Sequence, residues 1–427
     1  MNSSTSTETS HTKTLGDFIS LQRGTTYKSA LLGQPGAVLI GLASIEREGG
    51  FRNDKLETYG GECPQKISLK PGDLYVSLKD ITHDGHLLGA VARIPDFIEC
   101  GRLTQDTVKL VFEKELFPRN YIYWLLRTPQ YRNYCRSRQT GTTNLGLSRE
   151  DFLSLRVPPM TEATNAIVIA LESIEKKIEN LRRQNETLEA IAQTLFKHWF
   201  VDFEFPSEDG KPYKSSGGEM VRSELGDIPV GWRVGKLENF GKVITGKTPS
   251  TQNPDYWSNG LPFITPTDFK NYGKFVLNSE REISNLAVVE FENLIIPEKS
   301  VVVTCIGSDM GKVARTATRC VTNQQLNSLV FDKIKNGIEY VYHFLGSQYK
   351  MLRLMALGGS TMPIINKTAF SNIEIVIPDF FTLDKFNEIV EPFNLKVINN
   401  EQQIQTLTKT RDVLLPQLMS GKLRITE

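Results

Sequence analysis

The sequence predicts two mixed α/β domains separated by two long, antiparallel coiled-coil helices. Three observations lead to this fold class: the length of the chain, an internal repeat, and two stripes of apolar residues with heptad spacing. The 427 residues correspond to two or three domains at roughly 150 residues each. A hydrophobic content of 39% and a charged content of 23% are typical of a globular protein and exclude a disordered or collagen-like chain.

The internal repeat is found by sliding the sequence against itself. Leu15, Phe18, Gly24 and Thr26 recur as Leu237, Phe240, Gly246 and Thr248, each at an offset of 222 (237 − 15 = 222). The offset falls to 219 between Tyr121 and Tyr340, and to 218 between Phe152 and Phe370. The two halves of the chain are therefore tandem copies of one module.

Each copy begins with short β-branched or aromatic runs between Gly and Pro turns, which predict a mixed α/β domain, and continues as a long helix. The expected segments are a disordered polar tail (residues 1–14), domain 1 (15–158), the first long helix (159–203), a linker (204–231), domain 2 (232–378) and the second long helix (379–427). The linker has no apolar period and is rich in Gly and Pro, which favours a connector.

The long helices are predicted from apolar residues that recur at alternating steps of 4 and 3. The first stripe runs through Ile167, Leu171, Ile174, Ile178, Leu181, Asn185, Leu188, Ala192, Leu195 and Trp199, and the second through Phe386, Val390, Phe393, Val397, Asn400, Ile404, Leu407, Arg411, Leu414 and Leu418. Such stripes are stable only when buried, so we expect the helices to pair. Pro416 is expected to end or kink the second helix because it lacks an N–H.

We expect the pair to be antiparallel, with the two domains at opposite ends. Each stripe contains one Asn, and pairing Asn185 with Asn400 would also set Leu181 against Ile404 and Ile178 against Leu407. A polar residue in a coiled-coil seam commonly fixes the register. The alternative is that each Asn faces solvent at a frayed layer.

No catalytic constellation emerges. Residues 241–248 (GKVITGKT) match the G-x-x-x-x-G-K-[ST] pattern of a nucleotide-binding P-loop, but the following residues, 249–254 (PSTQNP), cannot form the helix that such a loop requires. Five cysteines without C-x-x-C spacing argue against a disulfide framework and a zinc site. Because no catalytic constellation is found, we expect a non-enzymatic protein. With no apolar run of membrane length and no signal-like N-terminus, we also expect a cytoplasmic protein.

Two equivalent stretches without any acid suggest contact with a polyanion. The net charge is only +1, so such contact requires local patches. Residues 116–149 and 340–373 contain no Asp or Glu, but they contain Arg or Lys among tyrosines, and each includes a small polar loop. In the alternative interpretation the tyrosines pack helices, and only some of the arginines point outward.

The sequence resembles the specificity (S) subunits of Type I restriction-modification systems over nearly its whole length. The resemblance is carried by residues 195–203 (LFKHWFVDF), 226–232 (GDIPVGW), 246–250 (GKTPS) and 414–421 (LLPQLMSG). It implies two target recognition domains that each read one half of a split double-stranded DNA site. It also implies a helix pair that sets the spacing and docks two methylation subunits, with restriction subunits around them.

The resemblance implies that the loops bind DNA and that this chain carries no cofactor, since S-adenosylmethionine belongs to the methylation subunit. Arg or Lys suits guanine and Asn or Gln suits adenine; the candidates for base contacts are Arg138, Gln139, Asn144, Lys247, Ser250 and Gln252, and Thr248 is a further DNA-binding candidate. The candidates for phosphate contacts are Lys79, Arg136, Thr142, Thr143, Ser360, Thr361 and Lys367. The expected docking residues are Trp199, Phe200, Leu414 and Leu418. The competing hypotheses are a stand-alone DNA-binding protein and a P-loop nucleotide-binding protein that uses Lys247 and Thr248.

Overall fold

A computed structural model describes residues 13–53, 56–80, 84–142, 144–270, 273–307, 310–357 and 364–420. The chain divides into two compact units. Unit 1 contains residues 1–178 and 405–427, and unit 2 contains residues 179–404. Each unit therefore holds one α/β domain together with a stretch of each long helix. Positions 1–12 of the predicted tail lie outside the described residues.

Unit 1 contains two sheets. The first is antiparallel, with strand order β1-β9-β5-β7, and the second has the order β3-β2-β8-β4, with β2 and β8 parallel. The strands are β1 (Ile19–Arg23), β2 (Leu32–Ile40), β3 (Thr58–Tyr59), β4 (Ser68–Leu69), β5 (Leu74–Ser77), β7 (Val91–Arg93), β8 (Gly101–Leu103) and β9 (Thr107–Phe112). A separate short ladder joins β6 (Lys79–Asp80) to β10 (Leu145–Gly146).

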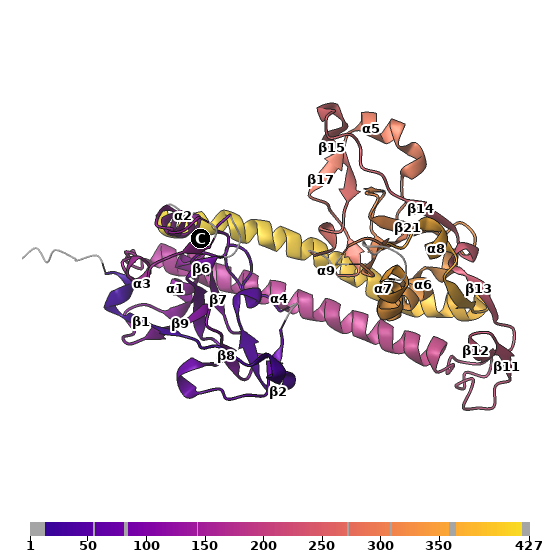
Figure 1. Ribbon diagram of the computed structural model, residues 1–427, viewed down its shortest axis with the longest axis horizontal. Coiled ribbons are helices and arrows are strands. Elements are labelled where there is room, and N and C mark those ends of the chain that lie inside the picture. The colour runs from indigo at the N-terminus through magenta and orange to yellow at the C-terminus, as the bar shows by residue number, and fades with distance from the viewer. Residues whose placement is uncertain are drawn as a thin grey trace, which may run out of the picture. The chain divides into compact units, whose positions relative to one another are not determined.

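The helices of domain 1 are α1 (Arg119–Leu125), α2 (Pro129–Ser137) and α3 (Arg149–Leu153). Figure 1 shows α1 and α3 next to the first sheet. The side chains of Thr128 and Ser148 accept hydrogen bonds from the backbone at the starts of α2 and α3, which satisfies N–H groups that have no partner within the helix. The core between helices and sheet includes the fully buried Trp124 and Phe152.

Unit 2 repeats this topology. Its larger sheet has the order β14-β21-β18-β19-β16, and its smaller sheet has the order β17-β15-β20, again with one parallel pair, β15 and β20. The strands are β14 (Lys242–Thr245), β15 (Trp257–Ile264), β16 (Phe275–Val276), β17 (Arg281–Ile283), β18 (Val301–Thr304), β19 (Val313–Thr316), β20 (Val321–Thr322) and β21 (Leu326–Val330). A ladder of β13 (Arg233–Lys236) and β22 (Glu374–Ile377) closes domain 2. The strand order β14-β21-β18-β19 matches β1-β9-β5-β7, as expected for two copies of one module.

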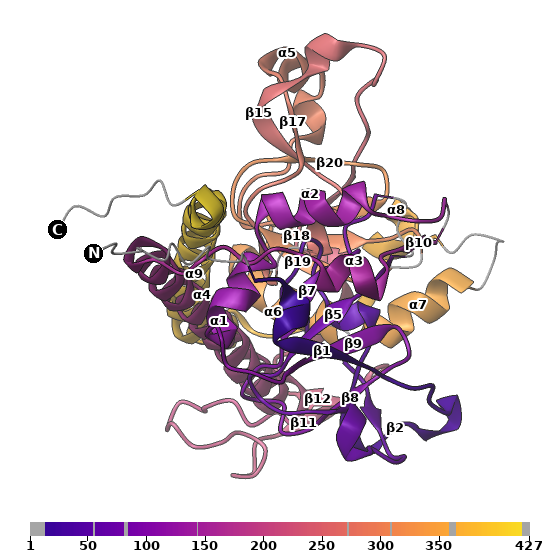
Figure 2. The same cartoon turned by 90° about the vertical axis from the view of Figure 1, so that its left-hand side faces the viewer.

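The helices of domain 2 are α5 (Asn285–Glu290), α6 (Ile338–Ser347), α7 (Tyr349–Leu357) and α8 (Lys367–Ser371). Helix α6 contacts β18 and β19, and α8 contacts β14. Both views show α5 with β15 and β17 projecting from the rest of the unit (Figures 1 and 2). This projection has its own small core, which includes Phe263, Ile283 and Phe291.

The long helices are α4 (Glu162–Phe196), extended by a π-helical turn at Lys197–Val201, and α9 (Phe380–Ser420). In unit 2, Asn185 contacts Asn400 and Trp199 contacts Phe386. Moving forward on α4 from Asn185 to Trp199 thus corresponds to moving back on α9 from Asn400 to Phe386. The helices are therefore antiparallel, as predicted, and the views show them side by side (Figure 1).

Two segments carry more regular structure than the sequence indicated. Helix α9 continues past Pro416 to Ser420, because Leu415 and Leu418 of the same turn are buried in the core of unit 1. Burial of the two side chains, worth about 1.5–3 kcal/mol each, offsets the cost of about 3 kcal/mol for a proline inside a helix. The linker is also structured, with a hairpin of β11 (Met220–Ser223) and β12 (Gly226–Pro229) and with Phe205 stacked between Tyr213 and Trp232.

Candidate functional site

The loops of domain 1 that carry the predicted contacts meet at one edge of its first sheet. We call this region the domain 1 loop edge; it comprises the described parts of residues 23–28, 79–86, 104–106 and 138–149. The N–H of Gly24 donates to the carbonyl of Thr107 at 3.1 Å, and β6 pairs with β10. The Arg149 guanidinium donates to the carbonyl of Leu21. Segments that are distant in the sequence are thus brought together.

A short polar hairpin forms the tip of this edge. The backbones of Thr140 and Gly146 exchange two hydrogen bonds of 2.8 and 2.9 Å. Gly141 has a φ of +88°, a conformation that favours glycine. The predicted contact residues Gln139, Thr142 and Asn144 are exposed on this hairpin, whereas Thr143 lies outside the described residues. The side-chain amides of Gln139 and Asn144 are therefore accessible on this hairpin.

Arg136 and Arg138 have acidic partners from other segments. Arg136 forms an ion pair with Glu48. The Arg138 guanidinium lies 3.9 Å from the centre of the Tyr134 ring, and its Nε is 3.7 Å from a carboxylate oxygen of Asp151. Arg138 is the more exposed of the two, with 42% of its side chain accessible against 34%. The positive charge of the acid-free stretch is thus partly neutralised by carboxylates of residues that lie outside the stretch.

Two other arginines of this stretch are buried, which agrees with the alternative that only some of its arginines point outward. Arg127 donates to the Tyr123 hydroxyl at 2.8 Å and lies 3.5 Å from Glu175 of α4. Arg132 donates to the carbonyl of Leu88 at 2.6 Å. Arg127 is 6% exposed and Arg132 is 1% exposed, because they satisfy carbonyls and carboxylates within the core.

A cleft of about 240 Å³ opens in the domain 1 loop edge. Arg23, Lys79, Gln105, Asp106 and Arg149 contribute its polar lining, and Leu78, Val108 and Leu147 contribute apolar side chains. Lys79 is a contact predicted from the sequence, whereas Arg23 and Gln105 are not, and Arg149 belongs to the basic stretch without an assigned contact. The signal that points to Arg23 is its position at the end of β1, directly before the repeated Gly24.

The equivalent region of domain 2, the domain 2 loop edge, comprises the described parts of residues 246–252, 305–311, 323–325 and 364–367. Lys247 is exposed, and its N–H donates to the carbonyl of Thr322 at 2.9 Å. The Thr248 hydroxyl donates to the side chain of Gln324 at 2.6 Å. The remaining described candidates, Ser250, Gln252 and Lys367, are exposed; Ser360 and Thr361 lie outside the described residues.

The P-loop-like motif does not have the geometry of a nucleotide site. Its first part is the strand β14, and a single 3₁₀ turn at Pro254–Tyr256 follows. A phosphate-binding loop instead leads into an α-helix, whose N–H groups hold the phosphates. Lys247 lies 5.7 Å from the centre of the Phe291 ring. This geometry does not favour the competing nucleotide-binding hypothesis.

A buried charge cluster joins domain 2 to the long helices within unit 2. Lys274 Nζ is 2.7 Å from Glu339 and 3.6 Å from Glu189 of α4, and Arg315 forms an ion pair with Glu339. Burial lowers the pKa of Lys274 to about 8, although the charge of Glu189 opposes this shift. Burial, with the positive charges of Lys274 and Arg315, holds the pKa of His343 well below its usual range.

Domain 1 has a related junction with α4. Arg93 pairs with Glu172 at 2.8 Å, and Glu172 also accepts a hydrogen bond from the Trp124 indole at 2.7 Å. By the repeat, Arg93 corresponds to Arg315 (93 + 222 = 315) and Glu172 to Glu391 (172 + 219 = 391). In unit 2 the ion pair of Arg315 is with Glu339 of α6 instead, while Glu391 of α9 pairs with Lys299 at 3.3 Å.

The two seam asparagines meet in unit 2. The Asn400 amide donates to the Asn185 carbonyl oxygen at 2.8 Å, and Asn185 in turn donates to Glu401 at 2.8 Å. Asn400 is fully buried. This contact is the pairing expected from the heptad stripes, and the same antiparallel step sets Leu181 opposite Ile404, both of them buried.

The residues expected to dock partner subunits belong to the chain's own cores. Trp199 and Phe200 are 5% and 7% exposed and pack in unit 2. Leu418 is 1% exposed in the core of unit 1, and Leu414 packs against that core. Such side chains present little area to a partner, so the expectation that they form a docking surface is corrected. Their heptad pattern indicated that these side chains are buried, but it did not indicate whether a partner subunit or the chain itself covers them.

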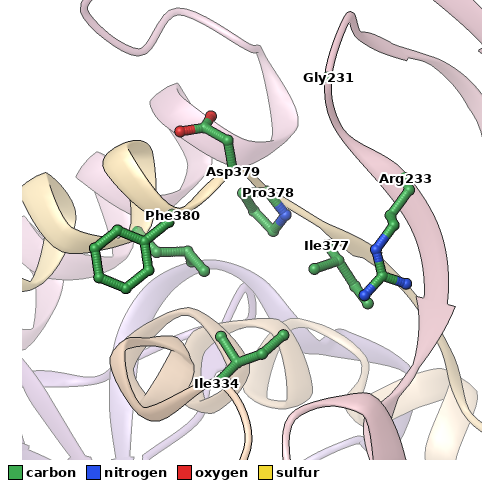
Figure 3. A pocket seen from close by; sticks show the side chains of 8 residues that line it. Gly231, Arg233, Ile334, Ile377, Pro378, Asp379 and Phe380 are labelled. Atoms are coloured by element: carbon green, nitrogen blue, oxygen red, sulfur yellow. The ribbon is translucent and has the colours of Figure 1, made fainter.

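A second cleft, of about 280 Å³, lies in unit 2 where α9 begins. Figure 3 shows Arg233 of β13, with Ile377, Pro378, Asp379 and Phe380 of the segment that leads into α9. Asp379 accepts a hydrogen bond from the Trp232 indole at 2.8 Å and another from the N–H of Thr382 at 2.9 Å. The carboxylate therefore caps α9 and holds Trp232 at the start of domain 2, which is a structural role.

Within the described segments, no cluster of three or more His, Cys, Asp or Glu residues is arranged to hold a metal ion. No helix there combines the length and apolar character that a bilayer span needs. All five cysteines are free thiols, and Cys135, Cys305 and Cys320 are buried.

Comparisons with known proteins agree with this architecture. The model for the Type I restriction modification DNA specificity domain matches residues 229–409. The MjaIX specificity subunit of a Type I restriction enzyme from Methanocaldococcus jannaschii is 30% identical over 331 residues, which cover 76% of this chain and 73% of that protein. The HindI specificity subunit from Haemophilus influenzae is 28% identical over 347 residues, which cover 69% and 74%.

Among solved structures, the S subunit of the Type I restriction-modification system from M. genitalium shares the fold, with a TM-score of 0.55 and 14% identity over 95% of both chains. The chain belongs to the family of Type I restriction enzyme specificity subunits.

Proposed function

We propose that this chain gives a Type I restriction-modification complex its DNA sequence specificity. Each domain reads one half of a bipartite double-stranded site through its loop edge, and the helix pair sets the distance between the halves. The observation that carries this proposal is the duplication: both units present exposed Arg, Lys, Asn or Gln side chains from loops at the same edge of the same sheet. Those residue types are the ones that read base edges.

The proposed role is non-catalytic. Two methylation subunits, each carrying its own S-adenosylmethionine, would modify an adenine that is flipped out of the duplex, and restriction subunits would join the same complex. The site of action is cytoplasmic, where cellular DNA lies. Surfaces other than the buried Trp199, Phe200 and Leu418 have to dock these partners.

The test uses the full chain co-expressed with its methylation subunits. Sequencing of methylated adenines should reveal one bipartite motif that is absent without this chain. Asn144→Ala should relax or abolish one half of the motif, and Gln252→Ala the other half, because the two residues lie on different loop edges. A motif altered in both halves by each variant would contradict the assignment of one half to each domain.

The same co-expression separates the competing hypotheses. A stand-alone DNA-binding protein would retain specific binding without co-purifying methylation subunits. A nucleotide-binding protein would bind ATP and lose that binding in Lys247→Ala. We expect co-purification of the methylation subunits and no ATP affinity in the isolated chain.

A further inference from the structure

The cleft of the domain 1 loop edge differs from the rest of that edge in its charge. Arg23, Lys79 and Arg149 contribute three cationic side chains, against the single carboxylate of Asp106. Lys79 is 3.4 Å from Asp106, and 54% of its side chain remains exposed. The lining is therefore net positive in a chain whose total charge is only +1.

We propose that this cleft holds one phosphodiester of the DNA backbone, with the adjoining deoxyribose on the apolar floor of Leu78, Val108 and Leu147. The inference rests on the proposed function and deepens it, since it assigns a positioning site next to the hairpin that reads bases. Contacts to phosphate fix the register of a protein on the duplex, whereas contacts to base edges supply specificity.

The two arginines of the cleft are held in place before any ligand arrives. The Nε of Arg23 donates to the carbonyl of Gln105 at 2.8 Å, and Arg149 donates to the carbonyl of Leu21. A guanidinium has five N–H donors, so each arginine keeps donors for an anion. Side chains that are already ordered lose less conformational entropy on binding.

The size of the cleft suits one sugar-phosphate unit. Pockets that enclose a whole small-molecule ligand measure about 300–1,000 Å³, and this cleft of about 240 Å³ is smaller. Its apolar floor also fits a deoxyribose better than it fits a hydrated inorganic ion. A segment of a longer polyanion, with the rest of the duplex outside, satisfies both conditions.

Domain 2 does not repeat this set of cations. By the repeat, Arg23 corresponds to Thr245 (23 + 222 = 245) and Arg149 to Lys367 (149 + 218 = 367). Lys79 pairs with Gly146 in domain 1, and Ile306 pairs with Ile364 in domain 2. Gly146 and Ile364 are equivalent positions of the repeat (146 + 218 = 364), so their pairing partners, Lys79 and Ile306, are equivalent as well. Domain 2 keeps one of the three cations, and we therefore assign the phosphate site to domain 1.

The experiment uses the full chain assembled with its methylation subunits and a duplex that carries the methylated motif. Lys79→Met and Arg149→Met remove one charge each and keep the aliphatic stem. Lys114→Met is the matched control, because Lys114 is exposed beyond the far end of β9. The measurements are affinity for target and non-target duplexes over a range of salt concentrations, with individual phosphates replaced by neutral methylphosphonates.

We expect each cleft variant to weaken target and non-target binding by the same several-fold factor and to reduce the salt slope by about 1; the control should change neither. One methylphosphonate position should weaken wild-type binding and have no effect in Arg149→Met. Unchanged affinity and slope, or a loss confined to the target duplex, would overturn the proposal.

Two further outcomes distinguish a free-anion site from a failure of the proposed function. Displacement of the duplex by millimolar inorganic phosphate, without sensitivity to any methylphosphonate, would make the cleft a site for a free anion and would also overturn the proposal. If the wild-type assembly binds the motif no better than random DNA, the proposed function fails, and the cleft assignment fails with it. Specific wild-type binding with unaffected variants removes the cleft assignment alone.

Discussion

The seam asparagines show how one polar contact can be supported inside an apolar interface. A buried amide without a partner costs about 1–3 kcal/mol, and the NH2 group of Asn400 avoids this cost by donating to Asn185 at 2.8 Å and to Gln184 at 3.3 Å. Asn185 is only partly buried and has a second partner in Glu401. The two residues therefore depend on each other, and their substitutions should not be additive.

We expect Asn185→Leu alone to destabilise unit 2 by about 1–3 kcal/mol, because it leaves the buried Asn400 amide without its nearest acceptor. The double substitution Asn185→Leu with Asn400→Ile should recover most of the loss, since both changed positions are then apolar. Urea denaturation of the full chain measures the effect. Asn399→Leu, at an exposed position of α9 next to Asn400, serves as the control. Losses that simply add up in the double variant would contradict the coupling of Asn185 with Asn400.

His343 supplies a prediction about acid stability. Its pKa is well below the usual value of 6.5 because it is buried beside Lys274 and Arg315, although Glu189 and Glu339 lie within 4 Å of its ring. The unfolded chain therefore binds a proton below about pH 6.5 that the folded chain does not. Stability contributed by neutral His343 is present above that pH and is lost as the pH falls.

The measurement compares urea unfolding at pH 7.5 with unfolding at pH 5.5. Wild type should lose stability at the lower pH, and His343→Gln should lose less of it, even if the variant is weaker at pH 7.5. The exposed His198, in the π-helical turn, provides the control as His198→Gln. An equal pH effect in wild type and His343→Gln would show that other groups cause the acid sensitivity.

At the scale of elements, the helix pair is the feature that connects fold to proposed function. An α-helix rises 1.5 Å per residue, so one heptad adds about 10 Å, which corresponds to about three base pairs at 3.4 Å each. Inserting one heptad into each helix at the same layer, after Arg183 and after Glu401, should therefore lengthen the spacer of the methylated motif by about three base pairs. Sequencing of methylated adenines checks this.

The same insertion in one helix alone breaks the seam and should abolish methylation. An unchanged spacer in the paired insertion would contradict the role of the helices in setting the distance. The two half-sites should keep their sequences in the paired variant, because neither loop edge is altered.

Sequence patterns predicted the elements better than the contacts between them. The repeat and the heptad stripes predicted two α/β domains and antiparallel helices. The heptad spacing is visible within one segment, and the repeat is found by comparing the sequence with itself, so neither pattern requires knowledge of the fold. The burial of Arg132 depends on carbonyls at Gly85, His86 and Leu88, and no spacing in the sequence predicts that. The cleft combines Arg23 with Arg149, which are far apart in the sequence, so only the folded chain brings its lining together.

At the scale of the whole molecule, the duplication has not made the two copies alike. Domain 1 carries a cleft whose three cations domain 2 does not repeat, whereas domain 2 carries helix α5 against β15 of its smaller sheet. Loops diverge more readily than the sheets that hold them. The two copies can thus read different half-sites while the strand order of their larger sheets stays the same.

The Asn185–Asn400 contact also bears on which halves can associate. By the offset of 219, Asn185 corresponds to Ile404 (185 + 219 = 404) and Asn400 to Leu181 (400 − 219 = 181). In a homotypic dimer of first halves, Asn185 would face a leucine, and in one of second halves Asn400 would face an isoleucine. Only the heterotypic combination matches amide with amide at this layer, so the seam disfavours self-association of either half.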